Sequence, residues 1–291
     1  MRILLWHVHG SWTHAFVQGG HDYLLPGPPD GIGPAGRPWR ATEVRLSEVD
    51  ADVAVVQRVE ELARVPDGIP VVYLEHNTPG TPGQRHPLAD RDGTLVHVTH
   101  FNDLMWDCGS TRTVVIEHGV VDPGPLYTGE LPRAAAVIND PVRRGRAVGA
   151  DLLPRFAPVD VFGIGTEQIG TERIGGLGDH GLEALHRELA RRRVYVHTAR
   201  WTSLGLSLLE AMHLGMPVVT LACTEAVRAV PAGVGVASAD VRELVEATRE
   251  LIADPALARE RGQRAREFAL AHYGLDAFLR NWDVLLKEVI G

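Results

Sequence analysis

The feature that most constrains the fold of this chain is the alternation of short apolar runs with stretches of helical periodicity. In the first half, the apolar runs are β-branched and each is followed by a polar or glycine-containing turn. They are Ile3–Val8, Val53–Val56, Val71–Leu74, Leu95–Val98 and Val114–Ile116. Strands that alternate with crossover helices form parallel sheets. The pattern therefore predicts an α/β fold.

A second series of strands begins near Ala134. Its apolar runs are AAAVIN, VDVFGIG, RVYVHTA, PVVTLA and GVGVAS, with helical stretches at Leu182–Ala190 and Leu204–Leu214. After Asp240 the apolar residues recur at spacings of three and four, which predicts helices. Asp254-Pro255 divides this region into two helices, because proline cannot continue a helix. Another helix is expected over Leu275–Ile290.

The chain length and one turn-rich segment predict two domains. A chain of 291 residues accommodates two domains of roughly 100–150 residues each. The segment VVDPGPLYTGE supplies turn residues between the two series of strands. We therefore expect an N-terminal domain over residues 1–125 and a C-terminal domain over residues 126–274.

The charge balance excludes one class of partner. The formal net charge is −8 and the isoelectric point is near 5.9, whereas a nucleic-acid-binding protein needs a basic stripe to neutralise phosphates. Lys287 is the only lysine. A phosphate on this protein must therefore be held by arginine, by helix N-termini or by backbone N–H groups.

The cysteines, histidines and apolar segments bear on disulfides, metal binding and cellular location. Cys108 and Cys223 form no C-x-x-C pattern, and the 14 histidines form no H-E-x-x-H motif, so we expect no disulfide and no metal. The N-terminal apolar run reads as a buried strand and not as a signal peptide. No stretch has the apolar length of a membrane span. We therefore expect a cytoplasmic protein without an integral membrane segment.

Candidate site residues follow the strands, because ligands of open parallel sheets bind beyond the carboxyl ends of the strands. His9, Gly10 and Ser11 follow the first run, and His76 follows the third. Two such domains that face each other would form a cleft, which is the default active site.

The most informative segment is Thr198–Thr220, TARWTSLGLSLLEAMHLGMPVVT. Gly205 stands at the start of a predicted helix, where a diphosphate can approach backbone N–H groups at the positive end of the helix dipole. Glu210 lies one to two turns further along, where its carboxylate could accept hydrogen bonds from two ribose hydroxyls. Its alternative interpretation is an ordinary helix glutamate.

This segment resembles the C-terminal signature of glycosyltransferase family 4, the retaining enzymes of the GT-B fold. Leu204-Gly205-Leu206 stands at the family's Gly-Phe-Gly element and Glu210 at its second glutamate, with Ala-Met-x-x-Gly-x-Pro-Val-Val following. Thr224-Glu225-Ala226 is similar to the Asn-Pro-Glu-Val element further downstream. The helix over residues 275–291 corresponds to the one that packs back on the first domain in that family.

The resemblance implies two Rossmann-like domains of the GT-B type and a metal-independent, retaining glycosyltransferase. It would move a sugar, expected to be a hexose, from a nucleoside-diphosphate sugar to a hydroxyl of a small molecule or glycan. The nucleotide sugar is then a co-substrate, and no other cofactor is implied. His76 corresponds to a histidine near the reacting carbon of the sugar, while Gly10 and Ser11 correspond to the loop near the donor phosphate or the acceptor.

Two positions depart from the family pattern. The first glutamate of its pair falls at Thr202, and the arginine expected at the first turn of the C-terminal domain falls at Asn139. Arg144-Gly145 stands at the family's Lys-Gly pair, with Arg143 beside it, and arginine meets phosphate oxygens in pairs. The catalytic residues implied are His76, Arg144 and Glu210. The donor would be bound by Gly10, Ser11, Asn139, Arg143, Arg144, Thr202, Ser203, Leu204, Gly205, Leu206 and Glu210.

The two departures leave other functions open. A catalytically silent protein of the same fold could bind a nucleotide sugar or assist a partner enzyme, and a sugar-nucleotide epimerase could use the same architecture. An oxidoreductase is disfavoured, because no dinucleotide fingerprint turn follows the first predicted strand.

Overall fold

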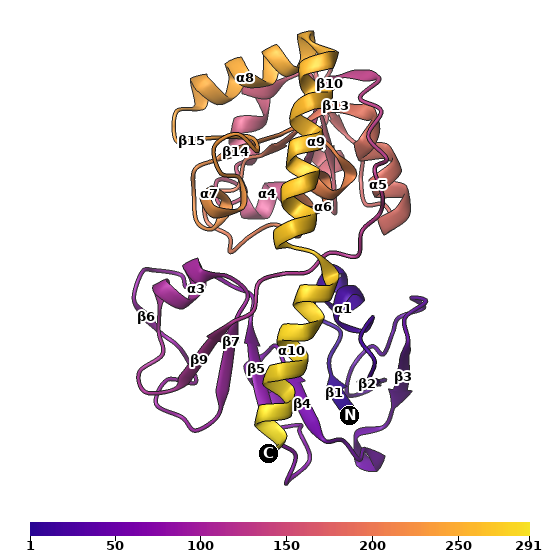
Figure 1. Cartoon of the computed structure of the whole chain (residues 1–291), viewed down its shortest axis with the longest axis vertical. Helices are drawn as coiled ribbons and strands as arrows, with labels where there is room; N and C mark the ends of the chain where they lie inside the picture. Colours follow the sequence, from indigo (N-terminus) through magenta and orange to yellow (C-terminus); the bar gives the residue numbers. More distant parts are fainter. The chain divides into compact units, whose positions relative to one another are not determined.

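The computed structural model describes all 291 residues, and they form two compact units. The first unit contains Met1–Val121 and Tyr273–Gly291, and the second contains Asp122–His272. The division thus falls at residues 121 and 122, within the turn-rich segment. The last helix, α10 (Leu275–Ile290), belongs to the first unit (Figure 1).

The first unit is built on a seven-stranded parallel sheet with the order β3-β2-β1-β4-β5-β7-β9. Its strands are β1 (Arg2–Leu5), β2 (Asp22–Pro26), β3 (Ala41–Val44), β4 (Val53–Val56), β5 (Val71–Glu75), β7 (Thr94–His97) and β9 (Arg112–Val115). The short strands β6 (Gln84–Arg85) and β8 (Trp106–Asp107) pair separately. All pairings in the main sheet are parallel, as the alternating pattern predicts.

An aromatic cluster joins two helices to one face of this sheet. Helix α1 (Gly10–Phe16) contributes Trp12 and Phe16, whose rings stack with centroids 4.7 Å apart. Trp282 of α10 meets both rings edge-on, at 5.7 Å from Trp12 and 5.0 Å from Phe16. Each of these three side chains is almost completely buried, so α10 closes the core of the first unit.

The opposite face carries the shorter elements η1 (Leu46–Glu48), α2 (Val59–Leu62) and α3 (His100–Met105) with their connecting loops. Its core contains Leu4, Trp6, Ala54, Val56 and Leu95. Because side chains alternate along a strand, Ile3 and Leu5 of β1 face the aromatic cluster while Leu4 faces this core.

The apolar pattern misses five strands: β2, β3, β12 (Ile174–Gly176) and the two-residue strands β6 and β8. Strand β3 lies at the edge of its sheet with two exposed residues, and β12 contains two glycines, so neither presents an apolar run. The predicted strand Ile3–Val8 is also too long, since β1 ends at Leu5. Residues 27–40, a segment rich in proline and glycine, form turns and irregular structure.

The second unit has a six-stranded parallel sheet with the order β12-β11-β10-β13-β14-β15. Its other strands are β10 (Leu131–Val137), β11 (Val159–Phe162), β13 (Arg192–His197), β14 (Val218–Leu221) and β15 (Val236–Ser238). Numbered within the unit this order is 3-2-1-4-5-6, which is the order of the Rossmann fold.

Helices cover both faces of the second sheet. Helix α8 (Val241–Ala253) and the 3-10 segment η2 (Ala150–Phe156) pack over one core, which includes Leu153, Phe156 and Leu244. Helices α5 (Leu182–Arg191) and α6 (Leu206–Leu214) lie on the other face, with α9 (Pro255–His272) against α6. The short elements α4 (Pro141–Arg144), η3 (Thr166–Ile169) and α7 (Ala226–Ala229) follow strands. The break between α8 and α9 falls at Asp254, as predicted.

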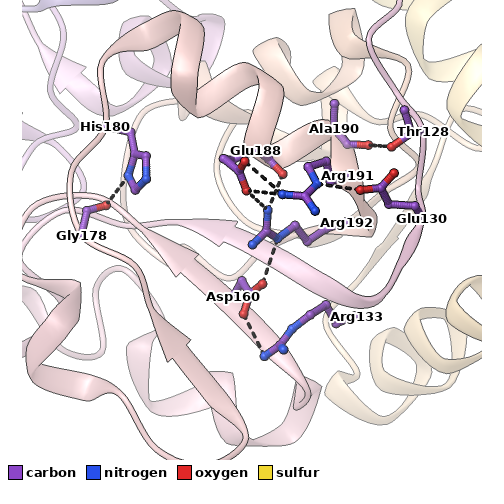
Figure 2. A network of polar contacts seen from close by, with 10 residues as sticks. All are labelled: Thr128, Glu130, Arg133, Asp160, Gly178, His180, Glu188, Ala190, Arg191 and Arg192. Atoms are coloured by element: carbon purple, nitrogen blue, oxygen red, sulfur yellow. Dashed lines mark hydrogen bonds and ion pairs between the residues drawn. The ribbon is translucent and has the colours of Figure 1, made fainter.

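A buried ion-pair network stabilises the amino-terminal edge of the second sheet (Figure 2). Asp160 of β11 is 4 % exposed and pairs with Arg192 of β13 at 2.8 Å and with Arg133 of β10 at 2.8 Å. Arg192 also donates to Glu188 of α5 at 2.6 Å. These pairs neutralise one another and fasten three adjacent strands, and they lie at the edge away from the predicted ligand site.

Each sheet has a point where the chain reverses the direction in which it adds strands. This switch point lies between β1 and β4 in the first unit and between β10 and β13 in the second. Loops that follow the two strands of a switch point diverge and leave room for a ligand. None of the helices combines the length and the apolar character that a membrane span requires.

Candidate functional site

The loops that follow β10 and β13 are hydrogen bonded to each other at the switch point of the second unit. The Thr198 hydroxyl donates to the carbonyl of Val148 at 2.9 Å, and the N–H of Arg200 donates to the carbonyl of Ala147 at 2.9 Å. Gly149 has φ +72°, and a Cβ there would collide with the carbonyl oxygen of Thr198. Only glycine fits this contact, so the loops form one connected surface.

Four arginines lie on these loops, and three of them have carboxylate partners. Arg143 pairs with Asp140 at 2.6 Å. Arg146 and Arg200 share Asp151, at 3.0 and 2.6 Å, and the hydrogen bond from Arg200 holds the pKa of Asp151 below its usual value. These three cations are therefore neutralised within the protein.

Arg144 differs from the other three arginines. It is half-buried, its guanidinium forms no ion pair, and burial followed by the charge of Arg143 lowers its pKa. A desolvated guanidinium without a counter-ion is costly to hold. An anion bound at this loop would remove that cost, so Arg144 is the cation best placed for a phosphate.

Helix α6 begins at the same edge of the sheet, directly after the loop from β13. Its N-cap is Gly205, and a Cβ on that residue would lie 2.6 Å from Cε1 of His197. The tip remains accessible, since Gly205, Leu206 and Ser207 are only half-buried. The first backbone N–H groups of a helix lack i−4 partners within the helix. Here the N–H of Leu208 donates to the carbonyl of Gly205 at 3.0 Å, and the N–H groups before it lie at the edge where ligands of parallel sheets bind.

His197 lies at the end of β13 beneath this helix tip. It is 9 % exposed, and burial lowers its pKa to about 4. The imidazole is therefore neutral at pH 7 and can donate one hydrogen bond.

Glu210 points into the space between α6 and α5. It is 5 % exposed, and its Oε2 lies 3.6 Å from Nε2 of His186 on α5. That separation is too long for a hydrogen bond, and the His186 nitrogen has no other partner. A buried carboxylate and imidazole with unused hydrogen-bonding capacity are suited to a ligand hydroxyl.

The other predicted donor residues of the second unit lie at this edge too. Thr202 is half-buried, while Ser203 and Leu204 are buried in the lead-in to α6. Asn139 is exposed after β10, and its side-chain oxygen accepts the N–H of Ile164 at 3.0 Å. Thr224, after β14, has φ +51°, a conformation that is rare and strained for a β-branched residue.

The remaining predicted residues lie at the carboxyl edge of the first sheet. His76 is buried after β5, and its ring lies 4.0 Å from His9 and 6.2 Å from His118, measured between centroids. Gly10 begins α1, and Ser11 follows it. No group of three or more His, Cys, Asp or Glu side chains, including this trio of histidines, is arranged to hold a metal ion.

Hydrogen bonds fix the position and tautomer of His76. Its Nε2 lies 2.8 Å from Oε1 of Gln57, and the amide of Gln57 donates to the carbonyl of Trp6 at 2.8 Å. Burial, followed by the charges of His9 and His118, lowers the pKa of His76 well below its usual value. Its Nε2 therefore carries the proton that Gln57 accepts, and Nδ1 is left as an acceptor.

Three residues of this environment, Gln57, His186 and His197, are absent from the sequence predictions. Gln57 and His197 each end or follow a strand, so applying the strand-end rule to every strand would have found them, as it finds His118 after the run Val114–Ile116. His186 lies within α5 and reaches Glu210 only through helix packing. No sequence signal identifies it.

Comparisons with known proteins bear on the second unit and on the fold. Residues 172–268 match the family model of glycosyl transferases group 1. The match lies within the second unit and includes Gly205 and Glu210. A search of the curated proteins finds no matching sequence.

Solved structures resemble the whole chain. Sucrose-phosphate synthase from Thermosynechococcus elongatus is 15 % identical, with a TM-score of 0.73 over 99 % of this chain and 98 % of that one. A glycosyltransferase from Rickettsia africae is 13 % identical, with a TM-score of 0.71 over 99 % and 98 %. HepE from Anabaena in complex with UDP is 13 % identical, with a TM-score of 0.70 over 99 % of both chains.

At these identities the likeness establishes the fold. The chain has the α/β architecture of GT-B glycosyltransferases, with parallel sheets in two Rossmann-like domains. This confirms the predicted fold class.

Proposed function

We propose that this protein transfers a sugar, with retention, from a nucleoside-diphosphate sugar to a hydroxyl of a small molecule or glycan. The observation that carries the proposal is the switch point of the second unit. There, the half-buried guanidinium of Arg144, which has no counter-ion, and the accessible tip of α6 lie on loops that are hydrogen bonded to each other. The group 1 glycosyltransferase match over this unit supports the same function.

In this proposal the diphosphate lies between Arg144 and the backbone N–H groups at the start of α6. The departing diphosphate gains negative charge as the sugar bond breaks, and fixed donors and a guanidinium stabilise that charge. Thr202, where a glutamate stands in the family pattern, would contact the sugar as an uncharged hydrogen-bonding group. HepE, a structural neighbour, has been crystallised with UDP, and we propose a nucleoside diphosphate for this chain too.

The ribose would lie against Glu210 and His186. The Glu210 carboxylate can accept two hydroxyl hydrogen bonds, and the imidazole 3.6 Å away has a nitrogen without a partner. In the first unit, Nε2 of His76 is held by Gln57, so Nδ1 is the ring atom left to accept a hydrogen bond from a substrate hydroxyl. His76 acts as a neutral acceptor there.

Glu210→Gln is expected to weaken binding of UDP, GDP or dTDP, whichever of them binds, by about tenfold to 100-fold. The amide keeps the volume of the side chain but replaces one acceptor oxygen with a donor, so one ribose hydrogen bond is lost. Titration calorimetry measures the affinity, with Glu246→Gln on the exposed face of α8 as the matched control. Unchanged affinity in Glu210→Gln would mean that the ribose lies elsewhere.

Cys223 provides an independent probe of the same site. It is half-buried just after β14 and close enough to Arg200 for that charge to act on its thiol, whereas Cys108 is buried in the first unit. We expect a saturating nucleoside diphosphate to slow alkylation of Cys223 and to leave Cys108 unaffected. Mass spectrometry of the two peptides measures both rates, and equal rates at Cys223 with and without nucleotide would contradict this site.

A binding protein without catalysis is the second candidate, favoured by the missing acidic residue at Thr202. Incubation with UDP-, GDP- and dTDP-sugars separates the two functions. Slow hydrolysis of one donor supports the enzyme, and tight binding without turnover supports the silent protein. Isomerisation of the donor without an acceptor would identify an epimerase instead.

A further inference from the structure

The first unit also has a ligand-binding edge at its switch point, between β1 and β4. The loop His7–Gly10 follows β1, and Gln57 and Arg58 follow β4. Gln57 donates to the carbonyl of Trp6 and so ties the two loops together. By the rule for open parallel sheets, a ligand of this unit binds at these loops.

Arg37 is held over the loop His7–Gly10 by aromatic and polar contacts. It comes from the irregular segment between β2 and β3, and its Nη1 lies 3.2 Å from Nε2 of His7. Its guanidinium carbon lies 5.3 Å from the centroid of the Trp39 ring, which itself packs edge-on against His7. A Cβ on Gly10 would lie 3.5 Å from Nη2 of Arg37. The guanidinium is therefore preorganised although it is exposed.

Neither Arg37 nor Arg58 has a carboxylate partner. The nearby carboxylates are already engaged. Glu61 accepts the backbone N–H groups of Gln57 and Arg58 at 2.7 and 3.1 Å. Glu75 accepts from Asn77 and pairs with His86 at 3.1 Å. Four other arginines of this unit form ion pairs, namely Arg2, Arg45, Arg85 and Arg112. What distinguishes Arg37 and Arg58 from the remaining unpaired arginines is their position at the carboxyl edge of the sheet.

Both guanidinium charges act on the loop that follows β1. Burial, followed by the charge of Arg37, lowers the pKa of His7, and burial followed by the charge of Arg58 lowers that of His9. Both imidazoles are thus neutral at pH 7. The Glu75 carboxylate acts on His9 in the opposite direction, but Arg37 and Arg58 are exposed at this edge, and an anion is the ligand that unpaired guanidinium groups attract.

We propose that His7, His9, Arg37 and Arg58, together the β1-edge cluster, bind an anionic group of the acceptor substrate, a phosphate or a carboxylate. Guanidinium groups bind both anions through paired N–H donors. His7 holds Arg37 in place by accepting its N–H at Nε2, and the other ring nitrogen of His7 is buried, so His9 is the imidazole that can add a hydrogen bond to the anion. That this ligand is the acceptor rests on the proposed function, in which the donor diphosphate is bound by the second unit. The acceptor is thereby assigned to the class of sugar phosphates, sugar acids and similar anionic hydroxyl compounds.

The test uses inorganic phosphate and acetate as probes on the full chain, with UDP present at saturation to occupy the donor site. Titration calorimetry should show that Arg37→Gln and Arg58→Gln each weaken phosphate or acetate binding by about tenfold or more. Arg37→Lys, which keeps the charge, should retain most of the affinity. Whichever of phosphate and acetate binds more tightly identifies the anionic group of the acceptor.

Arg91→Gln is the matched control. Arg91 is exposed, lies in the same unit and has no ion pair, but it precedes β7 at the amino edge of the sheet. Arg91→Gln changes the net charge by the same amount as Arg37→Gln, and it should leave anion binding unchanged within about twofold. Equal losses in Arg37→Gln and Arg91→Gln would reduce the effect to general electrostatics and overturn the proposal.

Two further outcomes separate this proposal from the proposed function. If UDP and phosphate compete, and Arg37→Gln weakens UDP binding, the β1-edge cluster serves the donor and the inference fails. If Arg144→Gln weakens UDP binding while phosphate binding is equal in Arg37→Gln and the unchanged protein, the inference fails and the donor site stands. Loss of phosphate binding in Arg37→Gln with no nucleotide binding by any variant would retain an anion site and reject the glycosyltransferase.

Discussion

Arg144→Gln should lower donor turnover by about 100- to 1000-fold, the usual effect of removing one preorganised group that stabilises charge in a transition state. The reason is the environment of this arginine. Its guanidinium is half-buried, forms no ion pair and lies on the loop that is hydrogen bonded to the lead-in of α6. Because the charge on the leaving diphosphate grows during the reaction, the loss should fall more on kcat than on KM.

The adjacent residue is the control. Arg143 is exposed and already paired with Asp140 at 2.6 Å, so Arg143→Gln should change turnover by no more than about threefold. Arg144→Lys should recover part of the activity, since it restores the charge without the planar fork. Steady-state kinetics measures the turnover of all three variants, with the donor identified by calorimetry. Equal activities of Arg143→Gln and Arg144→Gln would remove Arg144 from the site.

Acidification from pH 7.5 to pH 5 should destabilise the first unit by about 4 kcal/mol through His97 and His118 alone, which is a large part of the usual stability of a domain. His76, whose pKa burial also lowers, adds to the loss. Burial lowers the pKa of His97 to about 4 and that of His118 to about 3. Unfolded imidazoles titrate near pH 6.5, so below that pH the unfolded chain binds protons that the folded unit excludes. Each histidine then contributes about 2 kcal/mol of lost stability at pH 5.

The direction of the pH dependence and its division between the two units follow from these pKa values. These folded pKa values are depressed, so the stabilisation is complete above pH 6.5 and is lost as the pH falls toward 4. The raised pKa of Glu61 acts in the opposite direction. The second unit contains one comparable residue, His197 with a pKa of about 4, and should lose about half as much.

Urea unfolding at the two pH values measures the effect, and tryptophan fluorescence reports mainly the first unit. That unit contains Trp6, Trp12, Trp39, Trp106 and Trp282, while Trp201 alone lies in the second. His118→Asn should reduce the difference between pH 7.5 and pH 5 by about 2 kcal/mol. His100→Asn, at an exposed position, should leave it unchanged. Equal stability of the first unit at both pH values would contradict the burial of these imidazoles in neutral form.

The parallel α/β architecture could be predicted because both sheets are buried on two faces. Strands such as β4 and β5 therefore appear as continuous apolar runs, and Asp254-Pro255 marks a helix break that no packing could remove. Two of the strands that escaped prediction lack such a run, whereas β2 contains the short buried run Tyr23–Leu25. Strand β3 is an edge strand whose exposed residues need no apolar side chain, and β12 is mostly glycine.

Local sequence also determined the main parts of the candidate donor site. Gly205 at the start of α6 and Glu210 within it follow from a helix whose N-terminus comes after a buried strand, and the spacing between them is fixed by the helix itself. The location of Arg143 and Arg144 in the loop after β10 could also be predicted, because they follow an apolar run. These relations involve residues close together in the chain, so their geometry depends little on the rest of the fold.

Only the tertiary structure decided which of these groups are free to bind a ligand. Arg143 and Arg144 are adjacent in sequence, but one is paired with Asp140 and the other is half-buried without a partner. His186 reaches Glu210 from another helix, and Arg37 reaches His7 from a loop 30 residues away. Partner choice depends on the distances and burial that packing creates between distant segments. A one-dimensional pattern of residue types does not contain that information.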